Sequence, residues 1–183
     1  VKSGKVTIRG TDIRDVPLAE LMEQISMVFQ RVYLFQDTIY NNISMGKPDA
    51  TEEEIIAAAK ASHAHSFIKR LPQGYDTVIT EDGGSLSQGQ KQLLTIARAI
   101  LADNKILILD EATSALDSIS EKKIQDSIQK LVKGRTTLIV AHRLSTIRNA
   151  DRIAVIEKGN VLECGSYEEL LEKKGAFYRM EKM

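Results

Sequence analysis

Apolar residues follow two different periodicities along the chain. Three short, largely apolar runs stand at residues 25–29, 105–110 and 136–142. Each predicts a buried β-strand, because a strand covered on both faces is apolar on both faces. Amphipathic helices, with apolar positions every three or four residues, are predicted at 18–25, 88–102 and 120–134. Buried strands that alternate with helices predict an α/β fold with a mostly parallel sheet.

The remaining segments complete this pattern. A short strand is predicted at 5–9, a helical stretch at 37–70 with Thr51 as an N-cap, and a polar loop at 71–84. Further along, we expect a short helix at 144–149, a strand pair at 152–165 and a helical tail at 166–180. The helix-rich stretch between the first two buried strands is too long for a plain crossover. We therefore expect residues 1–30 and 102–183 to form a core subdomain and residues 31–101 to form an inserted helical subdomain.

Composition restricts the possible partners. Lys and Arg together number 25, as do Asp and Glu, so no bulk charge favours nucleic acid or anionic lipid. The single cysteine, Cys164, has no partner for an internal disulfide and is interpreted as a packing residue. No apolar run approaches the roughly 20 residues that span a bilayer. If the protein works at a membrane, another segment or subunit must cross it.

Polar side chains follow each of the three buried strands. Gln30 follows the first, Asp110 and Glu111 end the second, and His142 ends the third. Ligands of open α/β sheets bind beyond these strand ends. Here a carboxylate can hold Mg²⁺, a second one can activate water, and a histidine can donate to a phosphate. The alternative is that strands end in polar residues because they reach solvent, but this explains one position better than all three together.

A second polar element precedes the long helix at 88–102. Glycines at 83, 84 and 89 allow close backbone approach, and Ser87 caps a helix whose N-terminus suits a phosphate. Taken alone, a serine in this position is far more often a structural cap. His63 and His65 stand two apart on an expected helix, so they diverge and are interpreted as solvated surface.

Five short motifs together resemble the nucleotide-binding domain of ABC ATPases. They are VFQ at 28–30, LSQGQ at 86–90, ILILDE at 106–111, SALD at 114–117 and AHR at 141–143. They are similar, in order, to the Q-loop, the signature, the Walker B strand, the D-loop and the H-loop of that family. Each motif is weak alone, but all five in sequence order are specific. The signature departs from the usual LSGGQ only at Gln88.

The resemblance implies roles for eight residues. Glu111 is the catalytic base, His142 steadies the γ-phosphate, and Gln30 and Asp110 position Mg²⁺ and the attacking water. The residues implied to contact nucleotide across a dimer are Ser87, Gly89, Gln90 and Asp117. The cofactors implied are ATP and Mg²⁺.

One element of the family is absent from these 183 residues. A phosphate-binding P-loop reads GxxxxGK[ST], and no glycine of the chain begins this pattern. In family members the P-loop strand lies inside the sheet, beside strands like those at 105–110 and 136–142. We therefore expect a truncated domain that lacks the P-loop strand and helix, and that is inactive alone.

Segments such as LFQDTIYNNI and DEATSALD are similar to exporter-type domains. The resemblance implies an ATP-hydrolysing motor domain at the cytoplasmic face of the cell membrane. Its partners are a second nucleotide-binding domain and the transmembrane domain of the same transporter, with no nucleic acid and no membrane insertion by this segment. Two alternatives remain: an ABC ATPase acting on ribosomes or DNA, and a non-catalytic interaction fragment. The transported substrate is not readable from these residues.

Overall fold

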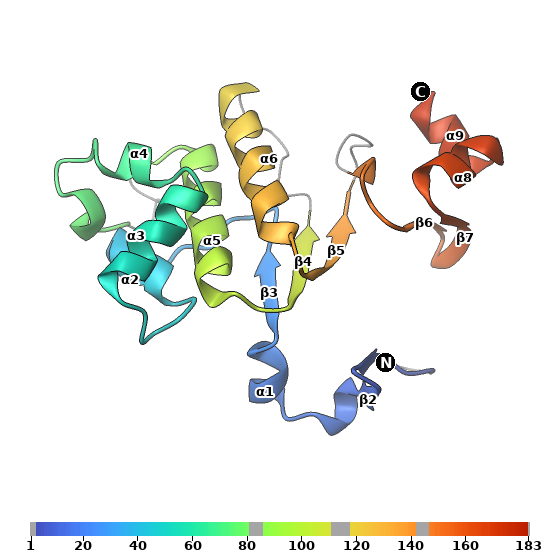
Figure 1. The fold of residues 1–183 in the computed structure, drawn as a ribbon, viewed down its shortest axis with the longest axis horizontal. Coiled ribbons are helices and arrows are strands. Elements are labelled where there is room, and N and C mark those ends of the chain that lie inside the picture. The colour runs from blue at the N-terminus through green and yellow to red at the C-terminus, as the bar shows by residue number, and fades with distance from the viewer. Residues whose placement is uncertain (1–2, 81–85, 111–117, 142–146, 183) are drawn as a thin grey trace. The chain divides into compact units, whose positions relative to one another are not determined.

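The computed structural model describes residues 3–80, 86–110, 118–141 and 147–182, with side chains from 121 onward in the third range. The chain forms two compact units, Val1–Leu138 and Ile139–Met183. Figure 1 shows the elements of both. The predicted division into a core and a helical subdomain remains a prediction.

A three-stranded sheet carries the predicted strand-end residues Gln30 and Asp110. Its strands are β3 (Ile25–Val28), β4 (Ile106–Asp110) and β5 (Thr136–Val140), in the order β3-β4-β5. β3 and β4 pair in parallel, with Ile25 opposite Ile106 and Val28 opposite Leu109. The arrows of all three strands point the same way in Figure 1. The predicted α/β class with a parallel sheet is confirmed.

The N-terminal residues form a small hairpin before this sheet. The hairpin consists of β1 (Thr7–Ile8) and β2 (Thr11–Asp12). It is followed by the 3₁₀ helix η1 (Ile13–Asp15) and by α1 (Leu18–Met22). The two strands pair antiparallel across a turn in which Gly10 has φ 85°, a value that glycine adopts without strain. Sequence reasoning placed a strand here but missed its partner. Pro17 precedes α1 in an extended conformation, so the helix begins at Leu18 as predicted, but it ends at Met22, three residues earlier than predicted.

The helical stretch predicted at 37–70 is three helices. They are α2 (Ile39–Ser44), α3 (Glu52–Ala61) and α4 (His65–Ile68), followed by the 3₁₀ helix η2 (Gly74–Asp76). Thr51 and Glu54 form the predicted capping box, which starts a new helix. His63 has φ 63° in the left-handed region, where an α-helix cannot continue. These two features divide the single predicted stretch.

Two long helices, α5 (Gln88–Ala102) and α6 (Ser118–Val132), connect the helical part to the sheet. α5 contacts α2, α3, α6 and β3. Its apolar face carries buried Leu93, Leu94, Ile96 and Ala97, as its periodicity predicts. The core continues through side chains that are at most 2 % exposed: Val28, Ile39, Ile43, Ile55, Ile68, Leu107, Leu109, Ile124 and Leu131.

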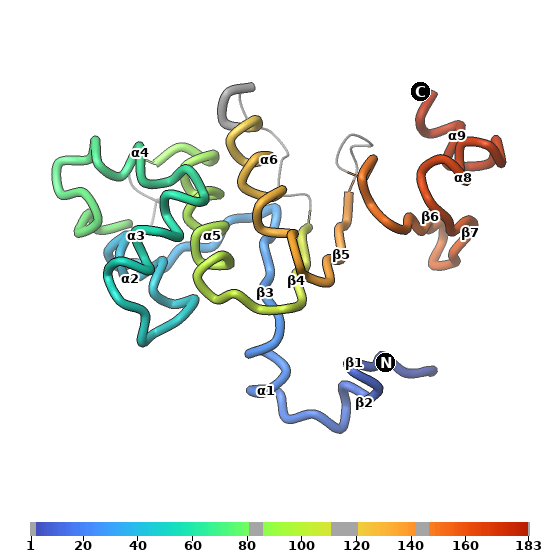
Figure 2. Tube along the Cα trace, in the orientation of Figure 1, coloured from blue at the N-terminus to red at the C-terminus, as the bar shows by residue number. Residues whose placement is uncertain are grey.

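The second unit has its own apolar core. It contains the hairpin β6 (Ile153–Glu157) and β7 (Asn160–Gly165), then α8 (Tyr167–Glu172) and α9 (Ala176–Glu181), seen at the C-terminal end of the trace in Figure 2. The predicted strand pair is confirmed. The predicted helical tail is two helices, because Glu163 accepts from the backbone N–H groups of Ala176 and Phe177 at 2.9 Å each. Gly175 permits this approach, since a Cβ there would overlap the Glu163 carboxylate.

Candidate nucleotide site

Gln30 and Asp110 lie at the same edge of the sheet. β3 and β4 are parallel, and Val28 pairs with Leu109, so the residues that follow both strands leave the sheet side by side. Asp110 is half-buried and Gln30 is exposed. A carboxylate and an amide at neighbouring strand ends provide oxygen ligands and a hydrogen-bonding group at the sheet edge where open α/β sheets bind ligands. The arrangement expected from the sequence is present for this pair.

Glu111, Asp117 and His142 lie outside the described residues, and their predicted roles remain predictions. The described part of the chain has no group of three or more His, Cys, Asp and Glu placed to hold a metal. A lone carboxylate still fits Mg²⁺, which proteins commonly bind through one or two carboxylates together with substrate phosphates and water. Asp110 matches that donor set, and Gln30 adds a neutral oxygen.

The start of α5 is built around Ser87. Ser87 Oγ accepts from the Gln90 backbone N–H at 3.2 Å, and Gln90 Oε1 accepts from the Ser87 backbone N–H at 2.8 Å. This reciprocal pair is a capping box, which satisfies two of the free donors of the helix N-terminus. Ser87 is exposed and Gly89 is buried in the first turn. The cap therefore sets the Ser87 hydroxyl at the surface, while the Gln90 amide oxygen is engaged within its own helix.

A buried glutamine that sequence reasoning missed connects α5 to the Gln30 edge. Gln92 is 3 % exposed, and its Nε2 donates to the Phe29 carbonyl oxygen at 3.4 Å. Phe29 is the residue directly before Gln30. An amide on the apolar face of an amphipathic helix is the signal that could have identified this contact, because a buried amide needs a partner. Helix α5 is thus in direct contact with the residue that precedes Gln30.

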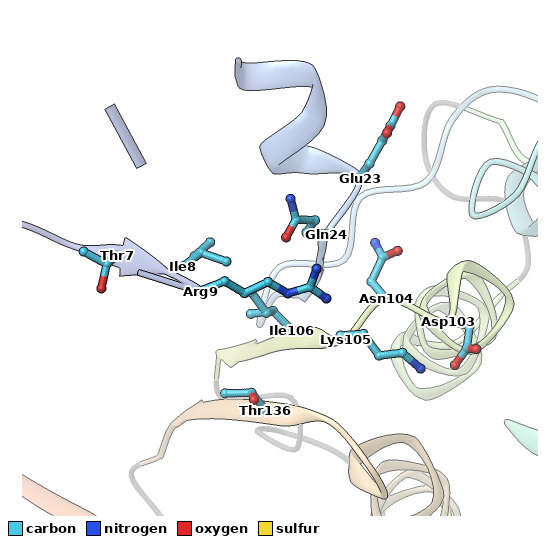
Figure 3. A pocket seen from close by; sticks show the side chains of 10 residues that line it. All are labelled: Thr7, Ile8, Arg9, Glu23, Gln24, Asp103, Asn104, Lys105, Ile106 and Thr136. Carbon is cyan, nitrogen blue, oxygen red and sulfur yellow. The ribbon is translucent and has the colours of Figure 1, made fainter. Parts of the chain in front are cut away.

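The cavity near the strand starts lies at the opposite edge of the sheet. It has a volume of about 480 Å³ and is lined by Gln24, which directly precedes β3, by Ile106 at the start of β4, and by residues 7–9 of the N-terminal hairpin. Figure 3 shows Arg9 reaching from that turn toward Gln24, with Lys105 and Asp103 beyond it. Asp110 is at the other end of β4. This cavity is therefore separate from the candidate nucleotide site.

The two other histidines are not the solvated surface residues expected. His63 lies between α3 and α4, half-buried, with Nε2 3.5 Å from Lys130 Nζ of α6. His65 is also half-buried, and its Nδ1 lies 2.8 Å from the Tyr75 hydroxyl. Burial lowers the pKa of both imidazoles and raises the pKa of Tyr75 to about 12. Each histidine therefore packs between helical elements as a structural group.

Cys164 lies in β7, in the strand pair where it was expected. It is half-buried, and its Sγ accepts from Arg152 Nε at 3.2 Å. No helix in the described part of the chain has both the length and the apolar character needed to cross a bilayer.

Comparison with known proteins shows a family match that includes most of these motifs. The family model described as ABC transporter matches residues 1–114. The chain is 55 % identical over 183 residues to an ATP-dependent lipid A-core flippase of Desulfotalea psychrophila, covering 100 % of the chain and 32 % of the flippase. It is 55 % identical over 175 residues to ABC transporter B family member 19 of Arabidopsis thaliana, covering 96 % of the chain and 14 % of that protein.

The fold has a close match among solved structures. A bacterial Atm1-family ABC exporter with ATP bound superposes with a TM-score of 0.90 at 42 % identity, over 98 % of this chain and 32 % of the exporter chain. The chain spans about a third of the length of the flippase it matches. The family match, the motif order and the shared fold agree: the chain belongs to the ABC transporter family.

Proposed function

We propose that this chain is part of the ATP-binding and ATP-hydrolysing motor domain of an ABC exporter. The observation that carries the proposal is the shared sheet edge, where Gln30 and Asp110 leave parallel strands next to each other. The Gln92 contact to Phe29 supports it, because it ties the signature helix to the same edge. The relatives named as a flippase and an exporter support transport as the work to which hydrolysis is coupled.

The proposed chemistry is attack of water on the γ-phosphate of ATP. Glu111 accepts a proton from the water as the oxygen–phosphorus bond forms and the bond to ADP breaks. Gln30 orients the water, and His142 donates a hydrogen bond to the γ-phosphate. Asp110 holds Mg²⁺, which when bound neutralises charge on the phosphates.

The proposed working unit contains two such domains. Ser87 and Gly89 at the start of α5 contact the ATP held mainly by the other protomer, where the partial positive charge of the helix N-terminus favours a phosphate. Asp117 is proposed to lie at the same junction, with Gln90 fixing the first turn of the helix. The capping box supports this assignment, because it presents the Ser87 hydroxyl at the protein surface.

A set of exposed apolar side chains from residues 29–35 and 78 is the proposed contact with the transmembrane domain. Phe29, Tyr33 and Val78 are 51 %, 69 % and 55 % exposed, and Phe35 packs edge-on against Tyr33 at 5.1 Å between ring centroids. We name these four residues the aromatic surface. Aromatic side chains grouped on a surface are typical of protein contacts. The proposed contact is at the cytoplasmic face of the membrane, and Phe29 in it directly precedes Gln30 in the sequence.

The proposal is tested first by ATP hydrolysis. The intact parent protein, purified in detergent with Mg²⁺, should hydrolyse ATP, and removal of Mg²⁺ with EDTA should abolish turnover. An intact parent that neither binds nor hydrolyses ATP would contradict the proposed function.

The isolated 183-residue chain should bind ATP more weakly than micromolar, the affinity that corresponds to about −8 kcal/mol. The reason is that no GxxxxGK[ST] segment is present to surround the phosphates with backbone N–H groups. Isothermal titration of the chain and of the intact parent under the same conditions measures the difference. Micromolar binding by the isolated chain would show that the phosphates are held elsewhere.

A further inference from the structure

Arg98 extends from α5 into the segment that follows the Q-loop. It is half-buried, and burial lowers the pKa of its guanidinium. Its Nε donates to the Asn42 carbonyl oxygen at 2.8 Å and its Nη2 donates to Asn42 Oδ1 at 3.1 Å. The guanidinium carbon lies 5.6 Å from the centroid of the Phe35 ring. No ion pair to Arg98 occurs among the described residues. This cation is therefore held by neutral acceptors and an aromatic face.

Asn42, which accepts from Arg98, also forms hydrogen bonds with the backbone of residues 35–38. It is fully buried in α2, and its Nδ2 donates to the carbonyl oxygens of Phe35 and Thr38 at 3.0 Å each. Its Oδ1 also accepts from the Phe35 backbone N–H at 2.9 Å. One side chain thus fixes both ends of a short turn and receives Arg98 at the same time. Asn42 is the junction between the signature helix and this turn.

The same turn forms backbone hydrogen bonds with residues 77–79. The Ile39 N–H donates to the Thr77 carbonyl and the Ile79 N–H donates to the Asp37 carbonyl, both at 2.9 Å. Val78 of the aromatic surface lies between these two bonds. Two backbone hydrogen bonds therefore hold residues 37–39 against residues 77–79.

The ends of α2 and α5 pack closely enough to transmit a displacement. Gly46, just beyond α2, lies against the backbone of α5, where a Cβ would overlap the Arg98 carbonyl oxygen. Contact of this kind has no space for independent sliding. The Arg98 side chain and the Arg98 carbonyl thus fix the two ends of the α2 region.

We propose that Arg98 is a positioning residue that makes the aromatic surface move with the signature helix. When the Ser87 end of α5 engages nucleotide, the guanidinium carries Asn42, and with it Phe35 and Val78, in the same direction. Lysine cannot replace arginine here, because a single ammonium lacks the planar fork and the stacking face. The inference rests on the proposed function and adds to it the link between ATP and the membrane-facing surface.

Hydrogen exchange of the intact parent, with and without ATP and Mg²⁺, tests this link. In the wild type we expect ATP to change backbone exchange both at residues 86–92 and at 33–42. In Arg98→Lys the change at 86–92 should persist, and the change at 33–42 should fall by about fivefold or more, the size of an ordinary coupling. The KM for ATP should stay within about twofold, because Arg98 does not touch the nucleotide site. Arg70→Lys, at an exposed position, is the matched control and should behave like the wild type.

The exchange measured at residues 33–42 distinguishes a positioning role of Arg98 from a merely structural one. Equal ATP responses at 33–42 in the wild type and in Arg98→Lys would overturn it, as would parallel loss at both segments in a variant with unchanged melting temperature. If Arg98→Lys does not fold, Phe35→Leu removes only the ring face and should reduce the response at 33–42 in the same direction; an unchanged response then overturns the proposal. A wild-type parent that does not hydrolyse ATP overturns both this inference and the proposed function, whereas normal hydrolysis with an unaffected Arg98→Lys overturns this inference alone.

Discussion

Replacement of Glu111 by glutamine in the intact parent protein should slow ATP turnover by about 10²- to 10⁴-fold while ATP binding is preserved. The amide keeps the size of the carboxylate and its ability to form hydrogen bonds. It cannot accept a proton from the attacking water. Steady-state hydrolysis and equilibrium ATP binding, measured on the same preparation, separate the two effects. A loss of turnover under about threefold would show that another group is the base.

Two histidine variants provide the comparison for this experiment. His142→Ala should also slow hydrolysis, because it removes the proposed donor to the γ-phosphate. The control is His63→Asn, since His63 has φ 63° and asparagine tolerates that backbone conformation better than alanine does. His63 contacts Lys130 between helices, so its replacement should leave turnover near the wild-type value. Equal losses in both variants would contradict the assigned site.

The isolated 183-residue chain should associate with itself and should not behave as a native monomer. β5 is an outer strand of the described sheet, and its Leu138 and Val140 are 61 % and 46 % exposed. No charged residue occurs in its sequence TTLIV to protect the edge. Such an edge recruits another strand. Each apolar side chain buried in this way is worth about 1.5–3 kcal/mol, against a total stability of about 5–15 kcal/mol for a domain.

Light scattering and thermal melting of the isolated chain measure this association. Leu138→Lys places a charge on the exposed face of β5 and should shift the chain toward monomer. Leu18→Lys is the matched control, because Leu18 is also an exposed leucine but lies on α1 and not on the β5 edge. A monodisperse wild-type monomer with one cooperative melt would contradict the expectation. So would equal effects of the two lysine variants.

Local sequence signals predicted the elements of this fold well. The apolar runs at 25–29 and 105–110 became β3 and β4, as predicted. The expected burial on both faces was wrong for the described structure, because only alternate residues of these two strands are buried and β5 alternates between half-buried and exposed residues. Thr51 and Ser87 cap helices as predicted, since a capping box requires only residues three apart. Family resemblance added the roles of Gln30 and Asp110, and the parallel register places those two residues at one edge.

The limits of sequence reasoning lie where a distant partner determines the local structure. The helical tail is divided at Gly175 because the Glu163 carboxylate, from another element, occupies the space beside it. The stretch at 37–70, predicted as one helical segment, is divided before the Thr51 cap and again at His63, whose backbone is left-handed.

By itself, the sequence determined the α/β class, the main helices and strands, the capping residues and the family, because each depends on residues close together in the chain. Only the tertiary structure decided that Gln92 meets Phe29, 63 residues away, and that Arg98 meets Asn42, 56 residues away. Hydropathy patterns record whether a side chain is buried, but not which polar group satisfies it. A buried amide or guanidinium must find an acceptor, and that acceptor is chosen by the packing of α5 against β3 and α2.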